Sequence, residues 1–222
     1  MEGQPGPNGC GPRTDCGTPG TGALLEQLGH PDYRVRIDAA GRLGSAGDIR
    51  FRAPLVGVAS NRGGERPEVR VAALRALGSL MEPGDYAGML EGFINGESRK
   101  VMTAARKLLK ASDPGGYSGR LARAGCLDHS AMKVYSSSRD PAAADLISGF
   151  LEERLESRDV IEGRHWGRVY TGVKALHRIG GTRGAGVIRE ISRYTARIDP
   201  RELKPLERER LAKIAGAARG AL

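Results

Sequence analysis

The sequence predicts an all-α fold, an α-solenoid of about five stacked helical pairs, and two observations support this prediction. A segment of small and apolar residues that ends in Leu or Ile followed by Gly recurs at residues 71–78 (VAALRALG), 173–180 (VKALHRIG) and, more loosely, 37–44 (IDAAGRLG). Such recurrence is typical of stacked helical repeats, because each unit can bury its apolar face only against its neighbours. No segment alternates apolar and polar residues over a strand's length, as a half-buried β-strand would.

The composition favours close helix packing and anionic partners. Hydrophobic residues make up 39% of the 222 residues but aromatic residues only 5%, so a core of Ala, Leu, Val and Ile is expected rather than a large aromatic-lined pocket. The formal net charge of +9 favours phosphate backbones, anionic membrane surfaces or acidic proteins as partners. Residues 97–139 carry nine Lys or Arg against three Asp or Glu, so this segment alone supplies +6 of that charge.

The N-terminal segment, residues 1–19, is dense in Gly, Pro and small polar residues and lacks any apolar period. It cannot bury enough surface to offset the entropy of ordering, so we predict a disordered tail followed by a solenoid over residues 20–222. No basic segment leads into an apolar run, and no later stretch is apolar enough to span a bilayer. These features predict a soluble, cytoplasmic protein without membrane insertion.

The three cysteines do not form a disulfide framework, which agrees with a reducing compartment. Cys10 and Cys16 are six residues apart in the tail and lack the Cys-x-x-Cys spacing of a zinc site, so we interpret them as a chance pair. Cys126 lies near leucines, which predicts a buried structural thiol.

The first repeat units are marked by their turns. A short helix is expected over residues 23–28, between Thr21 and Gly29. The first full unit runs over residues 31–43, breaks at residues 44–47 and restarts at Asp48, because Gly supplies the left-handed turn and Asp caps the next helix. The second unit repeats this plan from residue 67, so that Ala73 is the equivalent of Ala39, 34 residues earlier.

The later units are less regular. Residues 104–108 align with residues 73–77, which makes Ala104 the equivalent of Ala73 at a spacing of 31. Ala175 follows 71 residues later, close to twice the unit length, so one degenerate unit is expected between them. Its clearest helix covers residues 141–155, whereas residues 133–139 show no helical period. A helix follows residues 180–181, and a final one over residues 200–220 is expected to cap the solenoid.

Together these features resemble HEAT repeats over residues 30 to about 195, specifically the short HEAT-like type associated with phycobilisome (PBS) lyase subunits. In that family an Arg that follows an apolar residue lies early in one helix of each pair, as Arg36 follows Val35 and Arg70 follows Val69 here. The resemblance implies a right-handed superhelix with a concave binding face. It implies little about function, because members include bilin lyase subunits, deoxyhypusine hydroxylase, DNA glycosylases with related repeats and scaffolds with no catalytic role.

The enzymatic members of the family find little support in these residues. The hydroxylase resemblance would require His-Glu dipeptides to hold two irons, but the four histidines are followed by Pro31, Ser130, Trp166 and Arg178. A glycosylase would require aromatic residues and a carboxylate around a cleft, whereas the chain has one Trp and scattered aromatic residues. The bilin lyases offer no short motif to compare. We therefore predict no catalytic residue, metal or cofactor, and favour a protein that is not an enzyme.

The segment over residues 99–110 is the strongest candidate binding site. On a helix, five cations fall within roughly 120° of arc at 100° per residue, and they are Arg99, Lys100, Arg106, Lys107 and Lys110. The opposite side is apolar, and no acidic residue is present. A solvated face usually mixes both signs of charge, so the alternatives are an anion-binding face and an ordinary basic surface of an Arg-rich protein.

These observations predict a non-enzymatic scaffold or adaptor that binds an acidic protein partner on its concave, basic face. The predicted contacts are Arg36, Arg70 and the five cations of residues 99–110. Because a residue that recurs in regular repeats can equally brace their stacking, Arg36 and Arg70 remain open between these two roles. The alternative function is a nucleic-acid-associated protein that binds phosphate backbone through the same face, followed by a bilin-lyase-like or glycosylase-like enzyme.

Overall fold

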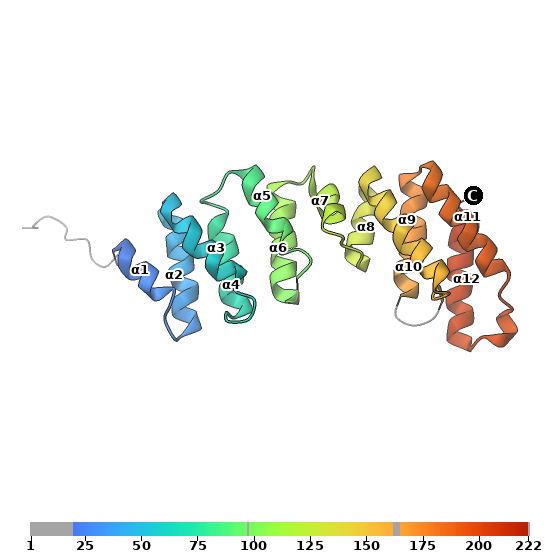
Figure 1. Ribbon diagram of the computed structural model, residues 1–222, viewed down its shortest axis with the longest axis horizontal. Coiled ribbons are helices and arrows are strands. Elements are labelled where there is room, and N and C mark those ends of the chain that lie inside the picture. Colours follow the sequence, from blue (N-terminus) through green and yellow to red (C-terminus); the bar gives the residue numbers. More distant parts are fainter. Residues whose placement is uncertain (1–19, 97, 162–164, 222) are drawn as a thin grey trace, which may run out of the picture. The chain divides into compact units, whose positions relative to one another are not determined.

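The computed structural model describes residues 20–96, 98–161 and 165–221, which are helical and contain no strand. The predicted disordered tail, with Cys10 and Cys16, lies outside the described residues. The chain divides into two compact units, residues 1–81 and residues 82–222, and within each unit the helices follow one another side by side (Figure 1). None of the described helices is long and apolar enough to cross a membrane.

The first unit contains four α-helices and one 3₁₀ helix among its described residues. They are α1 (Thr21–Gln27), α2 (Tyr33–Ala46), η1 (Ile49–Phe51), α3 (Arg52–Ser60) and α4 (Pro67–Leu77). Helix α1 packs against α2, α3 packs against α4, and α2 packs along α4. The buried side chains between α2 and α4 include Leu43, Leu74 and Leu77, which lie on the apolar faces that the repeats predict.

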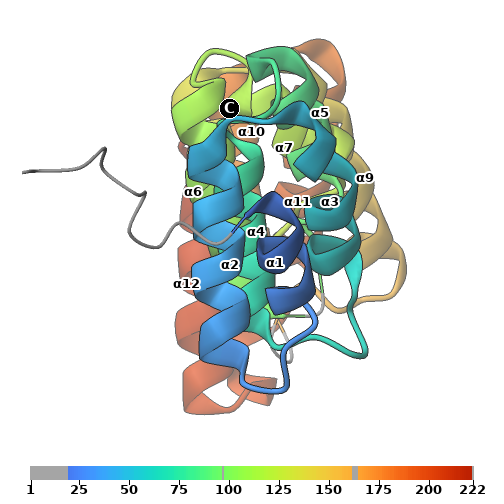
Figure 2. The ribbon, with the colours of Figure 1, turned by 90° about the vertical axis from the view of Figure 1, so that its left-hand side faces the viewer.

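The second unit contains eight α-helices and one 3₁₀ helix among its described residues. They are α5 (Pro83–Glu91), α6 (Arg99–Ser112), α7 (Tyr117–Arg123), α8 (His129–Ser138), α9 (Pro141–Glu156), α10 (Trp166–Ile179), α11 (Thr182–Ala196), η2 (Pro200–Glu202) and α12 (Pro205–Arg219). Helix α10 packs between α8 and α12, while α9 packs between α7 and α11. Viewed along the stack, α6 and α12 lie on one side and α5, α7 and α9 on the other (Figure 2).

This alternation of two helical layers confirms the predicted all-α, α-solenoid class. The helices that pack together within a pair are α1 with α2, α3 with α4, α5 with α6, α7 with α8, α9 with α10 and α11 with α12. The described residues therefore form six packed pairs. The prediction of about five pairs starts the pairing at α2 instead of α1. It pairs α2 with α3, α4 with α5 and so on, which leaves α1 and α12 as single helices at the two ends.

The register predicted for the third unit is wrong by one residue. Ala105 is fully buried, whereas Ala104 is only partly so. Ala39, Ala73 and Ala105 each lie seven residues after the N-cap of their helix, which are Asp32, Arg66 and Ser98. The pair Ala104-Ala105 is ambiguous in sequence, and the position of the N-cap decides which of the two faces the core.

The absence of a helix over residues 133–139 is also a wrong prediction, because α8 continues to Ser138. The side chain of Asp128 accepts the backbone N–H groups of Ser130 and Ala131 at 3.0 and 3.1 Å and so caps this helix. Met132 and Tyr135 are fully buried one turn apart. The serine run that obscures the period lies on the more exposed side of the helix.

The glycine that recurs in the repeated segment serves different purposes. The pattern predicts that α2 ends before Gly44, but the helix continues to Ala46. It ends at Gly47, whose φ is +70°. Gly44 lies where α2 meets α4: a Cβ added there would be 2.7 Å from both Cα and Cβ of Ala76. The equivalent Gly180 instead ends α10 in the left-handed region, with φ +83°.

We expect Gly44→Ala to destabilise the protein by about 1–3 kcal/mol, because the added methyl group overpacks the contact between α2 and α4. The matched control is Gly41→Ala in the same helix, where nothing lies within 4 Å of an added Cβ. There the higher helix propensity of Ala should stabilise the fold by about 0.5–1 kcal/mol. Urea denaturation measures both, and equal stabilisation by the two substitutions would contradict the close contact.

Candidate anion-binding surface

Helix α6 presents four exposed cations, Arg99, Lys100, Lys107 and Lys110, which we call the α6 face. The helix begins after Ser98, and its buried residues Val101, Ala105 and Leu109 lie on the opposite side, next to α5. No acidic residue occurs in α6. Two cations occupy the first turn, where the helix dipole disfavours positive charge. Arg99 and Lys100 therefore oppose the stability of their own helix, which favours a role for them outside the fold.

Arg106, the fifth predicted cation, is not part of this face. Its side chain is only 11% exposed, with Nη2 2.6 Å from Oδ2 of Asp128. Its Nε donates a hydrogen bond of 2.9 Å to the backbone carbonyl of Ile94, just after α5. On the helical wheel Arg106 lies at the edge of the basic arc, close enough to the apolar side to be drawn inward.

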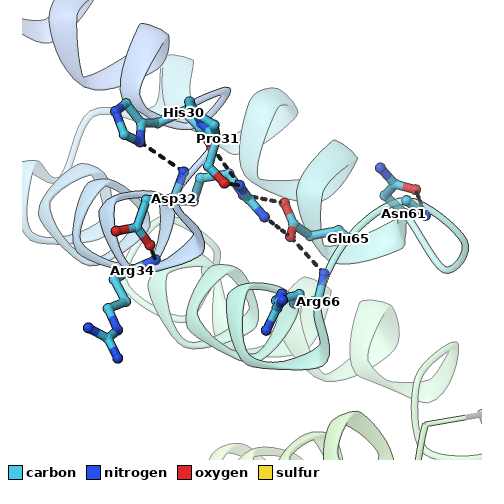
Figure 3. Close-up of polar contacts among 9 residues, drawn as sticks. His30, Pro31, Asp32, Arg34, Asn61, Glu65 and Arg66 are labelled. Carbon is cyan, nitrogen blue, oxygen red and sulfur yellow. Dashed lines mark hydrogen bonds and ion pairs between the residues drawn. The ribbon is translucent and has the colours of Figure 1, made fainter.

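Arg36 and Arg70 form similar internal contacts. Arg70 is 5% exposed, and its Nε donates to the carbonyl of Ala59 in the last turn of α3 at 2.8 Å. Arg36 donates from Nη1 to the carbonyls of His30 and Pro31, after α1, at 2.5 and 3.0 Å. Its Nε and Nη2 also form a two-pronged contact with Glu65, at 2.9 and 2.8 Å. His30, Pro31 and Glu65 lie together around this contact (Figure 3).

Arg36, Arg70 and Arg106 thus share one role, which we call the arginine brace. Each guanidinium extends from the longer helix of a pair to a backbone carbonyl in the last turn of the shorter helix or in the turn that follows it. The carbonyl of Ala59 belongs to the last turn of α3, where the carbonyls have no partner within the helix and the dipole is negative, so the cation of Arg70 satisfies it. The sequence left two roles open for Arg36 and Arg70, and the structure places both residues in bracing contacts.

In the fourth pair a tyrosine replaces the arginine. The hydroxyl of Tyr135, on α8, donates to the carbonyl of Cys126, after α7, at 2.8 Å. Burial raises the pKa of Tyr135 well above its usual value. Cys126 is itself buried, as predicted, and burial raises the pKa of its thiol, which leaves it protonated and unreactive.

Ion pairs connect the pair α5/α6 with the pair α7/α8. Arg120 on α7 donates to Glu91 and to Asp113, both at 2.6 Å, and Arg123 adds a second contact to Glu91 at 3.0 Å. Burial raises the pKa of Glu91, but its hydrogen bonds from Arg123 and Arg120 outweigh this and lower it overall. The hydrogen bond from Arg120 likewise lowers the pKa of Asp113. Several cations of residues 97–139 are therefore neutralised inside the protein.

The structure also brings together cations that the sequence prediction missed. Lys133 on α8, Lys174 and Arg178 on α10, and Lys213 on α12 line two neighbouring grooves. They come from helices about 40 residues apart, so no local pattern groups them. Two of them, Lys174 and Lys213, lie at the same distance from the N-cap of their helix, but this can be recognised only once the helix starts are known.

Other candidates from the sequence have structural roles. Trp166 is half-buried at the start of α10, where Arg210 and Lys213 of α12 lie over its ring at 5.4 and 5.8 Å. This agrees with a tryptophan between repeats rather than one that stacks on a ligand. His129 hydrogen-bonds to Thr171 on α10 at 3.2 Å. Among the described residues, no three His, Cys, Asp or Glu side chains gather as metal ligands would.

Comparison with known proteins supports the repeat class. A family model of HEAT repeats matches residues 21–110, which confirms a HEAT-like repeat in that part of the chain. Similar solved structures include an engineered protein with 14% identity and a TM-score of 0.34, the match covering 92% of this chain and 98% of that one. A designed armadillo repeat protein has 15% identity and a TM-score of 0.33, with 88% and 98% covered. No curated protein matches the chain.

We expect Arg70→Met to lower the free energy of unfolding by about 2–3 kcal/mol, because it leaves the Ala59 carbonyl without its charged donor. Arg75→Met, at an exposed position of the same helix, should change it by less than about 0.5 kcal/mol. Denaturant unfolding followed by circular dichroism compares the two. Similar small losses for both variants would mean that the brace contributes little.

The stability of the second unit should fall in acid through Asp128. Burial raises the pKa of Asp128, but the hydrogen bond from Arg106 and the backbone N–H of Ala131 outweigh it, so the pKa is lowered overall. A lowered pKa stabilises the fold above the unfolded value, about 3.9, and this contribution is lost as the pH falls through the folded value.

Asp128→Asn should therefore be less stable at pH 7 and should lose less stability between about pH 4 and pH 2 than the parent protein. Asp145→Asn, which removes the same charge from an exposed ion pair with Arg183, is the control and should keep the parental pH profile. Denaturant unfolding at several pH values measures both effects. Parallel pH profiles for all three proteins would refute the assignment to Asp128.

Proposed function

We propose that this chain is a non-enzymatic scaffold or adaptor that binds an acidic protein partner through the α6 face. The observation that carries the proposal is a helix with four exposed cations and no acidic residue. Repeat folds of this class present extended surfaces for protein contacts, which supports a scaffold role. Charge complementarity supports the acidic character of the partner, since opposite charges speed association and select against basic partners.

The placement of the perturbed ionisable groups supports a role other than catalysis. Catalytic groups with shifted pKa values usually gather in a cleft that substrate can enter. Here several of the shifted groups, Cys126, Asp128 and Tyr135 among them, belong to internal contacts of α6, α7 and α8. We also propose that the repeats are of the short PBS-lyase-like type. The spacings of 34 and 32 residues between Ala39, Ala73 and Ala105 support it.

The test uses a variant in which loss of binding cannot be ascribed to unfolding. Arg99→Glu/Lys100→Glu places acidic residues in the first turn of α6, where they should stabilise the helix by about 0.3–1 kcal/mol. The same variant should weaken binding of a labelled poly-glutamate chain by about tenfold and flatten the dependence of affinity on salt. Fluorescence anisotropy at several salt concentrations measures binding, and thermal unfolding measures stability.

The control Arg189→Glu/Arg193→Glu makes the same charge change at exposed positions of α11 and should leave poly-glutamate binding close to the parental value. Equal losses in the two variants would reduce the effect to net charge and overturn the α6 site. Oligouridylate RNA and duplex DNA serve as parallel probes. Tighter binding of either than of poly-glutamate, with a steep salt dependence, would favour the nucleic-acid function instead.

A further inference from the structure

The lysines of this chain gather in one part of the sequence and take no part in the arginine brace. All seven lie at residue 100 or later: Lys100, Lys107, Lys110, Lys133, Lys174, Lys204 and Lys213. Six lie on α6, α8, α10 or α12, Lys204 is the N-cap of α12, and all seven are exposed. The braces and the polar contact between α6 and α7 use arginine, whose rigid planar group suits buried ion pairs. The flexible, strongly hydrated lysines are left on one layer of helices.

Three of these lysines share a register. Lys107, Lys174 and Lys213 each lie nine residues after the N-cap of their helix, which are Ser98, His165 and Lys204. Equal offsets put a side chain at the same angle and height on each helix. Helix α8 carries its lysine one turn earlier, at Lys133. Since α10 packs between α8 and α12, Lys133, Lys174 and Lys213 form a series across three neighbouring helices, which we call the lysine row.

Two grooves connect the members of the lysine row. The groove between α8 and α10, of about 340 Å³, is lined by Lys133, Lys174, Arg178 and the hydroxyl-bearing Ser136 and Ser137. The groove between α10 and α12, of about 410 Å³, shares Lys174 with the first and adds Lys213. No Asp or Glu is among the residues that line either groove. The two grooves therefore adjoin at Tyr170 and Lys174, and both favour a ligand with several negative charges.

Two members of the lysine row have a neighbour that matters for ligand binding: Lys213 contacts Glu209, and Lys174 contacts Tyr170. Lys213 pairs with Glu209 on the same helix at 2.5 Å, and both side chains are exposed. Such surface pairs contribute little and exchange readily with another carboxylate. Tyr170 lines both grooves, with the Nζ of Lys174 5.3 Å from the centre of its ring. An aromatic ring between cations suits the flat face of a proline, as in grooves that recognise polyproline II segments.

We infer that the lysine row binds an extended acidic peptide segment of polyproline II type that carries a carboxylate at every third residue. This inference rests on the proposed function, because it specifies the part of the acidic partner that is recognised. Packed helices lie about 8–10 Å apart, which is the separation expected of Lys174 and Lys213 at equal height on α10 and α12. A polyproline II segment has three residues per turn and rises about 3.1 Å per residue, so every third side chain points the same way about 9 Å further on. A β-strand places same-side residues only about 6.6 Å apart, which fits the row less well.

The experiment compares two labelled peptides of equal composition on the full chain. One repeats Glu-Pro-Pro four times, and the other has the four glutamates together followed by the prolines. The spaced peptide should bind about tenfold more tightly than the block peptide, a difference equivalent to one or two additional ion pairs. Lys174→Gln should remove this preference, since Lys174 lines both grooves. Equal affinities for the two peptides would overturn the inference.

A variant that binds more tightly than the parent protein cannot owe this result to misfolding. Glu209→Gln removes the carboxylate that competes for Lys213 and should tighten binding of the spaced peptide about twofold. The control Glu190→Gln makes the same charge change at an exposed position of α11 and should leave affinity unchanged. The same gain in both variants would show a general charge effect and contradict a specific role of Lys213.

The outcomes separate this inference from the proposed function. Loss of poly-glutamate binding in Arg99→Glu/Lys100→Glu, with no effect of Lys133→Gln or Lys174→Gln on either peptide, would retain the α6 site and overturn the lysine row. The reverse pattern would retain the lysine row and overturn the α6 site. Tighter binding of oligouridylate RNA than of the spaced peptide at the same salt concentration would overturn both in favour of a phosphate backbone.

Discussion

The bond between a buried side-chain donor and a backbone carbonyl at the end of a short helix is the constraint on which much of this structure depends. Every helix leaves carbonyls without partners at its C-terminal end, and burying one unsatisfied costs about 1–3 kcal/mol. In these pairs the last turn of the shorter helix, or the turn that follows it, has such a carbonyl, and the neighbouring helix supplies its donor. Arg36, Arg70 and Arg106 supply them in three pairs, and the Tyr135 hydroxyl does so in the fourth. Arginine suits this task because it remains charged when buried and can bind a second acceptor, as Arg106 does with Asp128.

This constraint explains which parts of the fold could be predicted from the sequence. Apolar spacing and Gly-Asp turns are local, so the helices around the repeated segments were predictable from the residues themselves. The pattern that marks Arg36 and Arg70 was also visible, but their acceptors are mostly backbone carbonyls, which any residue provides and no sequence pattern records. Arg106 looked like a member of the basic face because its partner Asp128 lies in another helix, 22 residues away. Helix α8 was missed because its serine run suggested a loop. The helix forms because its cap and two buried side chains outweigh that run.

The cations that are paired within the fold must be separated from the exposed ones before the net charge of +9 is interpreted. Many cations of the basic middle segment are used in the fold: Arg106 pairs with Asp128, and Arg120 and Arg123 pair with Glu91. Net charge alone therefore overstates the number of cations that a partner can reach. The exposed lysines are a better guide, since lysine contributes little to buried pairs and keeps its hydration. Their positions on α6, α8, α10 and α12 could not be grouped from sequence, because the grouping depends on where each helix begins.

The α6 face and the lysine row are joined by a third groove, of about 460 Å³, lined by Lys110 on one side and Lys133 on the other. Nearby, ion pairs of Glu91, Asp113 and Asp128 connect α5/α6 with α7/α8. Added salt screens exposed charges over roughly 10 Å at 0.1 M, whereas apolar packing such as that of α8 on α10 is not screened. Salt thus acts on this protein in two ways: it weakens attraction to an anionic ligand, and it screens the more exposed of the ion pairs between α5/α6 and α7/α8, such as that of Arg123 with Glu91. A ligand that engages only α8, α10 and α12 experiences the first effect alone, so its affinity should depend less steeply on salt than that of a ligand spanning all four helices.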